Sequence, residues 1–589
     1  MQSIPEIMDQ EMGRAFAAAG YDAALGKVSV STRPDLSQYS CNGAMAGAKQ
    51  YHKAPFAIAE EVARKLQDSA IFTDVSVVKP GFLNMNLKNE FLAKYLEEER
   101  TAEKFGFEIS KTPRTVVLDY GGPNVAKPLH VGHLRSAVIG EAIKRIVRYH
   151  GDTAIGDIHL GDWGLQMGLV ITELKHRQPD LPYFDDSFAG EYPEQAPFTV
   201  SDLEEIYPFA SGKSKEDPEY YAEALENTHL LQEGKRGYRA LWEQIMKVSI
   251  ADMKRNYARL DVSFDLWNGE STVNDLIAPM AEKMKKDGYA YESEGALVVD
   301  VADPKDPKEI PPCMILKSDG AALYTTTDLA TIEDRVEKYH PDEIIYITDK
   351  RQELHFTQVF RAARKCGLVP QETVLTHIGF GTVNGKDGKP FKTRQGGVMR
   401  LETLIDDIDA AMLEKIRANG EIPEAEAEDT AKTVALAALK YGDLSNQASK
   451  DYIFDVDKFT SFEGNTGPYI LYTIVRIHSI LTRYQAEGNE DIERLSIRLP
   501  QSSQEAALMR DLAGFGAMMT DAFTNLAPHR ICSYIYQLSN DFNSFYHGTR
   551  ILSEEDAEKK NGWIALLKLT MDILNTCIQV LGFSAPDRM

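Results

Sequence analysis

The sequence predicts an α/β protein built on a doubly wound parallel nucleotide-binding sheet, preceded by a small α/β module and followed by an all-α helix bundle. Two observations carry this prediction. Between Thr115 and Gly151 a buried strand, a Gly-Pro turn and an apolar-striped helix follow one another, and beyond about residue 436 only helical apolar spacing remains. We expect domains at 1–108, 112–435 and 436–589, with an insertion in the second at about 178–270.

The central strand is the β-branched apolar run Thr115–Tyr120, which is typical of a strand buried in a parallel sheet. Gly121–Asn124 turns the chain, and a helix opens at His130–His133 and ends at Gly151. The N-terminus of such a helix offers backbone donors and a positive dipole end to a phosphate chain. Lys127 adds a cation three residues before the first histidine, and Gly132 leaves room for a flat base or a ribose.

The histidine pair alone is weak evidence, because an H-x-x-H pair on a helix is usually surface chemistry or part of a metal site. A zinc protease site is excluded, since the spacing and the internal glutamate of H-E-x-x-H are absent. A P-loop is excluded as well, because G-x-x-x-x-G-K-[ST] occurs nowhere in the chain. The strand, the turn and the lysine together favour a nucleotide site.

The segment Pro123–Ser136 resembles the "HIGH" signature of class I aminoacyl-tRNA synthetases, in the version found in arginyl-tRNA synthetases. The resemblance extends with gaps over nearly the whole chain. It implies a Rossmann-like catalytic domain of the HUP type that uses ATP with Mg²⁺, L-arginine and tRNA(Arg) and forms an arginyl-adenylate. It also implies that ATP is bound by Pro123, Asn124, His130, Gly132 and His133, that Asn124 holds the amino acid, and that Lys127, His130 and His133 act in catalysis.

Composition sets limits on this interpretation. The 65 Lys and Arg against 89 Asp and Glu give a net charge of -24, the wrong sign for a protein that coats nucleic acid indiscriminately, so tRNA would be met by local basic and aromatic patches. Five scattered cysteines without a C-x-x-C pair argue against disulfides and a structural zinc. We find neither an apolar run of about 18 residues nor a signal peptide, which predicts a cytoplasmic protein without a membrane partner; we expect a monomer.

A second buried strand and a glycine-punctuated loop follow in Ala154–Gly164. Ligands of an open parallel sheet lie outside the carboxyl ends of its strands, so His159, Asp162 and Trp163 are pocket candidates. The family resemblance agrees, because an H-x-G-D-W-G-x-Q segment, completed here by Gln166, follows the signature in that family. His159 is then expected on the arginine side.

The second half of the sheet is predicted to resume with strands across Ala322–Ala330 and Ile344–Asp349. If the chain is already helical at Tyr324, this tyrosine and Asp328 share one face, and an aspartate beside an aromatic suits a guanidinium. A packed tyrosine and a helix-capping aspartate are the alternative. The resemblance implies arginine binding by Tyr324, Asp328 and Gln352 and adenine binding by His355. Asp119, at the end of the first strand, is a reasonable partner for the substrate ammonium group.

Gly385–Gly397 is a basic, glycine-rich loop that could fold over a polyphosphate, with a solvated basic hairpin as the alternative. It occupies the place of the class I motif K-M-S-K-S, which it matches only in part, with Phe391 against the methionine and Thr393 at a lysine position. The resemblance implies that Lys127 compensates. Lys389, Lys392 and Arg394 remain the catalytic cations expected in this loop, with Lys392 also on ATP.

The two ends of the chain are expected to meet tRNA. Residues 1–108 resemble the module that grips the tRNA elbow in this family, with a purely structural appendage as the alternative. Apolar stripes at Ile470–Leu481, Leu508–Met519 and Ile564–Leu581 predict a helix bundle. Asn465 and Tyr469, at the start of its first helix, combine an amide and an aromatic that can hold an unpaired base; a packed tyrosine is the alternative.

Two other functions fit part of this pattern. One is a nucleotidyltransferase with the same signature that adenylates a small molecule without tRNA, against which the two terminal domains argue. The other is a catalytically dead tRNA-binding paralogue, which would be expected to lack a signature histidine or the pocket aspartate. His130, His133 and Asp328 are all present.

Overall fold

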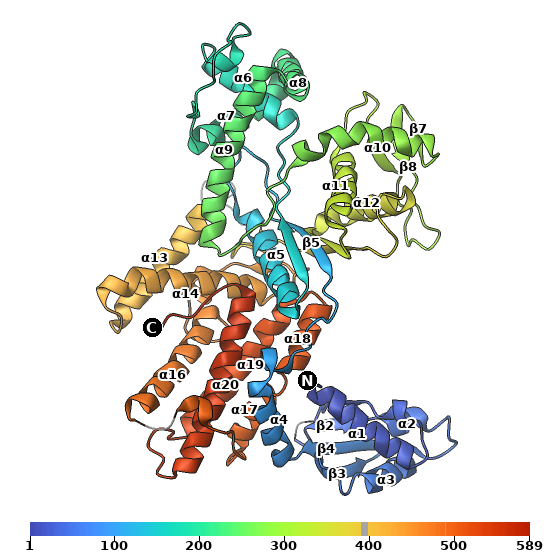
Figure 1. Ribbon diagram of the computed structural model, residues 1–589, viewed down its shortest axis with the longest axis vertical. Helices are drawn as coiled ribbons and strands as arrows, with labels where there is room; N and C mark the ends of the chain where they lie inside the picture. The colour runs from blue at the N-terminus through green and yellow to red at the C-terminus, as the bar shows by residue number, and fades with distance from the viewer. Residues whose placement is uncertain (34, 390–398, 489–490) are drawn as a thin grey trace. The chain divides into compact units, whose positions relative to one another are not determined.

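The structure, a computed structural model, describes residues 1–33, 35–389, 399–488 and 491–589. It divides into two compact units, which are described separately below and whose elements are labelled in Figure 1. Unit 1 comprises Met1–Ile109, Phe462–Gln579 and Ser584–Met589. Unit 2 comprises Ser110–Ser461 and Val580–Phe583.

Unit 2 is built on a four-stranded parallel sheet in the order β11-β10-β5-β6. Its strands are β5 (Thr115–Tyr120), β6 (Thr153–Asp157), β10 (Glu343–Asp349) and β11 (Val374–Phe380). The predicted bounds of β5 are confirmed, and five of its six residues are buried. The strand order reverses between β5 and β10, and in a doubly wound sheet this is where the crevice for a ligand opens.

The helix after β5 begins and ends where the sequence predicts. α5 (Val131–His150) starts at the N-cap His130 and ends at Gly151, which adopts the left-handed conformation with φ 99°. Ser136 on this helix links it to the sheet, because its hydroxyl donates to the carbonyl of Ile347 on β10 at 2.7 Å and accepts from the Gly121 amide at 2.8 Å. The first turn of α5 is therefore held at the carboxyl ends of β5 and β10.

The strand expected across Ala322–Ala330 is wrong. This segment is the start of α11 (Tyr324–Tyr339), and it is followed by β10, η5 (Lys350–Gln352) and α12 (Glu353–Lys365). Three consecutive threonines favour a strand by propensity. Here the Thr326 hydroxyl instead accepts from the Leu323 amide at 2.9 Å and caps the helix N-terminus.

Between β6 and β10 the chain makes two excursions. The first is a helical group, seen at the top of Figure 1, that consists of α6 (Leu165–Arg177), α7 (Val200–Glu216), α8 (Pro218–Gln232) and α9 (Arg236–Arg259). The second contains α10 (Asn274–Lys286) and an antiparallel sheet, not predicted from the sequence, of β7 (Ala290–Ser293), β8 (Ala296–Val299) and β9 (Cys313–Leu316). The loop between them, Leu260–Glu270, runs along the end of β6, where the Leu160 amide donates to Asn268 at 2.7 Å.

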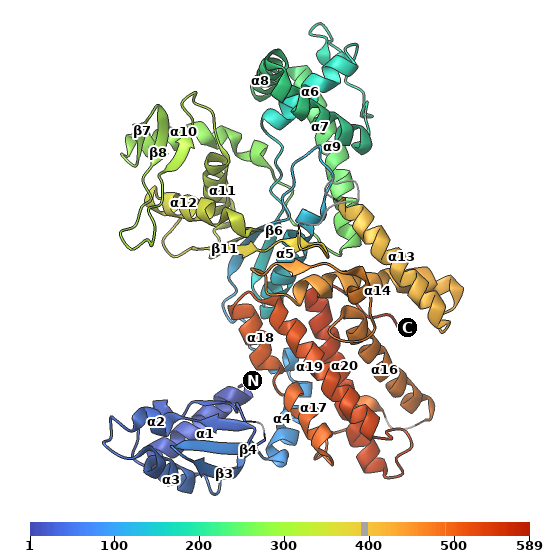
Figure 2. The ribbon, with the colours of Figure 1, turned by 180° about the vertical axis from the view of Figure 1, so that it is seen from behind.

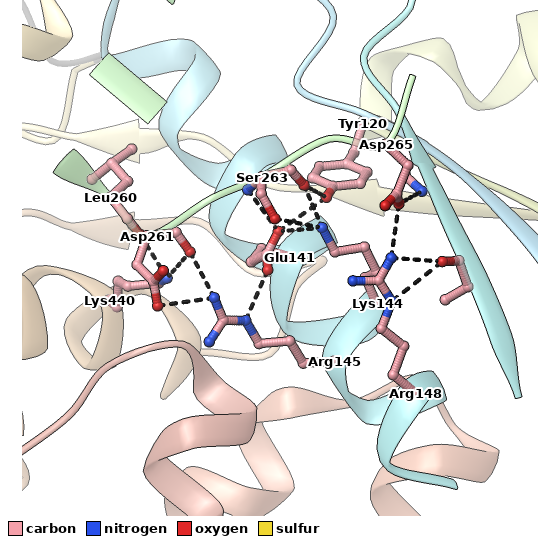
Figure 3. Close-up of polar contacts among 12 residues, drawn as sticks. Tyr120, Glu141, Lys144, Arg145, Arg148, Leu260, Asp261, Ser263, Asp265 and Lys440 are labelled. Atoms are coloured by element: carbon pink, nitrogen blue, oxygen red, sulfur yellow. Dashed lines mark hydrogen bonds and ion pairs between the residues drawn. The ribbon is translucent and has the colours of Figure 1, made fainter. Parts of the chain in front are cut away.

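A buried polar network fastens α5 to this loop (Figure 3). Glu141 accepts from Lys144 and Arg145, each at 2.8 Å, and from the Tyr120 hydroxyl at 3.1 Å. The fully buried Lys440 donates to the Leu260 carbonyl at 2.7 Å. Glu141 also accepts from the Ser263 amide of this loop at 3.1 Å, so strand, helix and loop are joined by charge-assisted hydrogen bonds, which are stronger than neutral ones.

The remainder of unit 2 is largely helical: β12 (Val383–Asn384), α13 (Leu401–Asn419), α14 (Glu424–Leu444), β13 (Tyr452–Ile453) and α15 (Val456–Phe459). β13 pairs in parallel with β12. The expectation that no strand follows residue 436 is therefore wrong, since a strand of two residues is too short to show an alternating pattern.

Unit 1 combines an antiparallel sheet in the order β1-β2-β4-β3 with a helix bundle. The sheet strands are β1 (Val28–Val30), β2 (Tyr39–Cys41), β3 (Phe72–Val78) and β4 (Phe82–Leu87), and the module's helices are α1 (Ile4–Ala18), α2 (Gly43–Gly47), α3 (Pro55–Lys65) and α4 (Asn89–Thr101). α4 reaches the bundle, where Glu97 accepts from the Ile497 amide at 2.9 Å.

The bundle helices lie side by side in both views (Figures 1 and 2). They are α16 (Gly467–Ala486), α17 (Ser503–Leu512), α18 (Phe515–Thr524), α19 (Pro528–Gly548) and α20 (Ala557–Leu581). The stripe predicted over Leu508–Met519 belongs to two helices, broken near Gly514. α20 is long and apolar enough to cross a membrane by length and composition, yet 67% of its most apolar window is buried among the other helices. The predicted fold class, a parallel nucleotide-binding sheet with an N-terminal α/β module and a C-terminal helical domain, is confirmed.

Candidate active site

A cavity of about 620 Å³ opens at the carboxyl ends of β5 and β10, where the strand order reverses. Its wall comes from the end of β5 and its turn, the first turns of α5 and α11, and the β10–α12 connection. A second cavity of about 400 Å³ adjoins it and shares Asn124, Gly161, Glu270 and Tyr324 with it. The predicted residues that line the first cavity are Asp119, Asn124, His130, Gly132, His133, His159, Tyr324, Asp328, Gln352 and His355.

The two signature histidines are neutral donors and acceptors at the N-terminus of α5. Their rings lie 3.9 Å apart, Nδ1 of His130 accepts from the Gly132 amide at 3.0 Å, and Nδ1 of His133 accepts from the His130 amide at 3.1 Å. Burial lowers the pKa of His133 to about 3, and burial together with Lys127 lowers the pKa of His130. Both Nε2 atoms remain available to donate to an anion in the cavity.

Close backbone contact shapes the turn before α5. The Val125 amide donates to the Gly161 carbonyl at 3.0 Å, and the Gly161 amide donates to Pro123 at 3.1 Å. A Cβ at Gly161 would lie 2.1 Å from the Asn124 side-chain oxygen, so any larger residue there would displace the Asn124 amide. Gln166, which completes the resembling segment, donates to the Val125 carbonyl. The two loops predicted to face each other are in contact.

The opposite end of the cavity is acidic. Asp328 on α11 accepts a hydrogen bond from Nε2 of His355 on α12 at 2.5 Å. Tyr324, one turn before Asp328, is 71% exposed and lines both cavities. Asp119, at the end of β5, is buried and accepts from Arg335 at 2.7 Å.

Glu270 is an acidic cavity residue that the sequence did not single out. Its amide donates to the Leu160 carbonyl at 3.0 Å, which brings its carboxyl group into the wall that the two cavities share. Burial, with Asp162 and Asp328 nearby, raises the pKa of Glu270 to about 8. A cationic ligand beside this carboxyl group would favour its ionised form. Glu270 lies in a polar segment before α10, and this segment has no apolar periodicity from which its position could be predicted.

Asp162 does not belong to the described cavities, although the sequence made it a pocket candidate. It is 1% exposed and accepts from the Ser271 amide at 3.0 Å and from the Ser271 hydroxyl at 2.5 Å. It therefore fixes the Glu270 loop instead of facing a ligand. Trp163, the other candidate, lines the second cavity and donates to Asn274 at 3.0 Å.

The predicted cations fall into three groups. Lys127 lines the second cavity, with its amine 4.1 Å from the centre of the Tyr207 ring on α7. Lys389 is exposed, and Lys392 and Arg394 lie outside the described residues. The Met399 carbonyl accepts from the Val131 amide at 3.0 Å, so this residue contacts the start of α5. Among the described residues, no group of three His, Cys, Asp or Glu could hold a metal ion.

The predicted tRNA contacts lie in unit 1. Tyr469, on the first turn of α16, donates to Asn540 at 2.7 Å and accepts from Asn543 at 3.0 Å, both on α19. Asn465 is exposed just before this helix. The exposed Tyr472 follows one turn later, with the Arg476 guanidinium 4.6 Å from its ring centre.

Comparisons with known proteins give matches along nearly the whole chain. Three family models match: "tRNA synthetases class I (R), catalytic domain" over residues 100–456, "DALR anticodon binding domain" over 470–589, and "Arginyl tRNA synthetase N terminal domain" over 4–87. A curated protein named arginine--tRNA ligase from Agathobacter rectalis is 59% identical over 100% of both chains. One of the same name from Alkaliphilus oremlandii is 54% identical over 98% of this chain and 97% of that protein.

Solved structures support the fold. The crystal structure of arginyl-tRNA synthetase from Plasmodium falciparum matches with a TM-score of 0.82 at 22% identity, and that from Thermus thermophilus with 0.77 at 23%, each over 100% of both chains. One family model spans more than half of the chain, and relatives above half identity span nearly all of it. The chain therefore belongs to the class I arginyl-tRNA synthetases, the arginine–tRNA ligases.

Proposed function

We propose that this protein attaches L-arginine to tRNA(Arg) in two steps at the cavity between β5 and β10. Arginine and ATP first give arginyl-adenylate and pyrophosphate, and the arginyl group then passes to the 3′ end of the tRNA. One observation carries the assignment: a helix N-terminus with two histidines and an acid-lined recess open into a single cavity. The first suits a triphosphate and the second suits a guanidinium.

The chemistry requires no covalent intermediate on the protein. The arginine carboxylate attacks the α-phosphate in line, and the bond to the leaving pyrophosphate breaks, so the protein supplies positioning and charge stabilisation. We assign the phosphates to His130, His133 and Lys127, together with Lys389, Lys392 and Arg394 of the basic loop. Pro123, Asn124, Gly132 and His355 would hold the rest of the nucleotide. Mg²⁺ would enter with ATP, since it is commonly bound through substrate phosphates and water.

The amino acid would lie along the acidic wall. Asp328, Tyr324 and Gln352 would bind the guanidinium, with Glu270 as a second carboxylate that the structure adds to the predicted set. Asp119 would accept from the α-ammonium group, and Asn124 and His159 would complete the site. A guanidinium satisfies two carboxylates with planar, directed donors, whereas the point charge of a lysine ammonium matches them less well. This pairing accounts for a preference for arginine over lysine.

The tRNA would be met by unit 1. We assign base reading to the start of α16, with Asn465 and Tyr469, and elbow binding to the N-terminal module. Stacking and hydrogen bonding to unpaired bases suit a protein with a net charge of -24 better than neutralisation of many phosphates would. We further propose that the protein acts as a monomer in the cytosol.

The decisive experiment is pyrophosphate exchange with each of the common amino acids, with and without tRNA(Arg). We expect exchange with arginine alone among the amino acids, and only when tRNA is present. Exchange that depends on another amino acid would overturn the arginine assignment. Exchange with arginine and ATP in the absence of tRNA would refute the tRNA requirement while leaving the assignment intact.

A further inference from the structure

Arg335 lies beneath the acidic end of the cavity. It is on α11, two turns after Asp328, and is 1% exposed. Its Nη2 donates to Oδ2 of Asp119 at 2.7 Å and to Oδ2 of Asp157 at 2.8 Å. Asp119 and Asp157 are paired neighbours on β5 and β6, so one guanidinium nitrogen connects both strands to α11.

Two other side chains lie close to this cluster. The Tyr346 ring on β10 lies 5.4 Å from the guanidinium carbon, and His159 faces the same carboxylates from the loop after β6. Within the described part of the chain, neither His159 ring nitrogen has a hydrogen-bond partner. Arg335 therefore faces two carboxylates, one of which, Asp119, lines the cavity.

The two oxygens of Asp119 have different roles. Oδ2 accepts from Arg335, whereas no described residue donates to Oδ1. Asp119 lines the cavity, so a ligand can approach this carboxylate. A cationic donor such as an ammonium group suits a buried carboxylate oxygen that has no other partner.

We propose that Arg335 is a positioning residue for the amino-acid substrate: it holds Asp119 by one oxygen, with Asp157 as the anchor, and presents the other oxygen to the α-ammonium group. This inference rests on the proposed function. Arg335 itself does not line the cavity.

The electrostatics follow from this arrangement. Burial raises the pKa of Asp119, and Arg335 opposes that rise. Without Arg335, Asp119 and Asp157 would be two neighbouring carboxyl groups sharing a site, and two such groups do not both stay ionised. A protonated Asp119 would lose its attraction for an ammonium group, and it would lose more at pH 6 than at pH 8.

The test compares two arginine analogues as competitive inhibitors of tRNA arginylation by the full-length enzyme. Agmatine keeps the amine and the guanidinium but lacks the carboxylate. 5-Guanidinopentanoate keeps the carboxylate and the guanidinium but lacks the amine. In R335M we expect the inhibition constant of agmatine to rise by about 10²-fold, as when one partner of a buried charge pair is removed. That of 5-guanidinopentanoate should change less than about threefold, since it has no ammonium group to lose.

A purely structural role predicts something different. If R335M weakened both analogues equally, or neither, the positioning role would be wrong. Failure of the wild-type enzyme to be inhibited by either analogue would instead contradict the proposed function. The matched control is R361M, which breaks the pair between Arg361 and Asp306 elsewhere in unit 2 and should leave both constants unchanged.

The variant D157N provides a second test of the proposal in case R335M does not fold. It keeps Arg335 on Asp119 and removes only the charge of the anchor, so agmatine should weaken by a smaller factor with the same selectivity over 5-guanidinopentanoate. Melting curves verify the fold of each variant. If D157N is folded and the two analogues weaken alike, the proposal is refuted whatever the state of R335M.

Discussion

The carboxylate of Asp328 and the imidazole of His355 lie 2.5 Å apart, joining α11 to α12 across the mouth of the cavity. His355 Nε2 donates to Oδ2 of Asp328, so Oδ1 of Asp328 can accept from another donor. The residue proposed for the guanidinium and the one proposed for the nucleotide are therefore in direct contact. Through this contact, loss of the Asp328 charge should also be felt by His355, though less than by the guanidinium.

Replacing Asp328 with asparagine should raise the KM for arginine by about 10²-fold, because the ion pair with the guanidinium is reduced to a hydrogen bond to a neutral amide. The KM for ATP should change by less than about threefold. Steady-state arginylation kinetics measure both. D334N is the matched control, since Asp334 lies on the same helix and pairs with Lys338 at 2.8 Å. Equal effects on both substrates would remove Asp328 from the arginine site.

The pH dependence of arginine binding should report Glu270. Its pKa of about 8 means that it is protonated in the free enzyme at pH 7, and a guanidinium binds the ionised form. The KM for arginine should thus fall as pH rises from 6.5 to about 8 and then level, by at most about tenfold per pH unit. E270Q should flatten this profile. A wild-type KM that is constant over this range would show that Glu270 does not meet the substrate cation.

Lys127 should act on the phosphates. We expect K127A to slow pyrophosphate exchange by about 10²- to 10³-fold, as for the loss of one transition-state donor, with little change in tRNA affinity. K386A is the control, because Lys386 already pairs with Asp455 at 3.1 Å. Y207F should retain activity while Y207L lowers it, since only the leucine removes the ring over which Lys127 lies. If K127A exchanges pyrophosphate at a nearly normal rate, the cation that acts on the phosphates would instead come from the basic loop.

Lys440 should make stability rise with pH. Burial lowers the pKa of Lys440 to about 7, so above pH 7 the folded protein binds fewer protons than the unfolded chain, whose lysines stay charged to about pH 10. The free energy of unfolding then gains up to about 1.4 kcal/mol per pH unit between pH 7 and 9. Melting temperatures of K440M should lack this rise, whereas K432M, changed at an exposed position on the same helix, should keep it. Parallel profiles for wild type and K440M would mean that this lysine stays charged.

Two substitutions at Tyr469 should distinguish its contribution to the stability of the bundle from its contribution to tRNA binding. Its hydroxyl makes two hydrogen bonds to α19, so Y469F should lower the melting temperature and change the KM for tRNA little. Y469A also removes the ring and should raise the KM for tRNA by about tenfold, which corresponds to the loss of one stacked base. Arginine and ATP should be less affected. Unchanged tRNA kinetics in a folded Y469A would move base reading to the exposed Tyr472 and its neighbour Arg476.

Long, locally encoded elements could be predicted from the sequence. β5 and α5 follow their apolar spacing to within a residue, since strand burial and helix amphipathicity are both properties of neighbouring positions. The start of α11 was predicted as a strand because its three threonines favour one, whereas the local cap between Leu323 and Thr326 starts a helix there. The strands β12 and β13 were not predicted either. Each has only two residues and is recognised only by its pairing with the other.

The site residues also divide into those that lie in short-range sequence patterns and those whose partners are remote in the sequence. The signature near α5 and the pair Tyr324 and Asp328 are short-range patterns, and these residues line one cavity as predicted from the resemblance. Glu270 and Arg335 were missed because their partners are remote: Arg335 meets Asp119 across 216 positions. One signal was available, since Asp328 and Arg335 are seven residues apart and share a helix face.

The discontinuity of unit 1 has a consequence for synthesis. α4 leaves the ribosome early, with Leu92, Tyr95 and Leu96 in its buried face, but the bundle it packs against begins only after Phe462. Translation of Ser110–Ser461 at about 5–20 residues per second takes on the order of 20–70 s. During that interval the apolar face of α4 lacks the helices that it packs against in the folded protein.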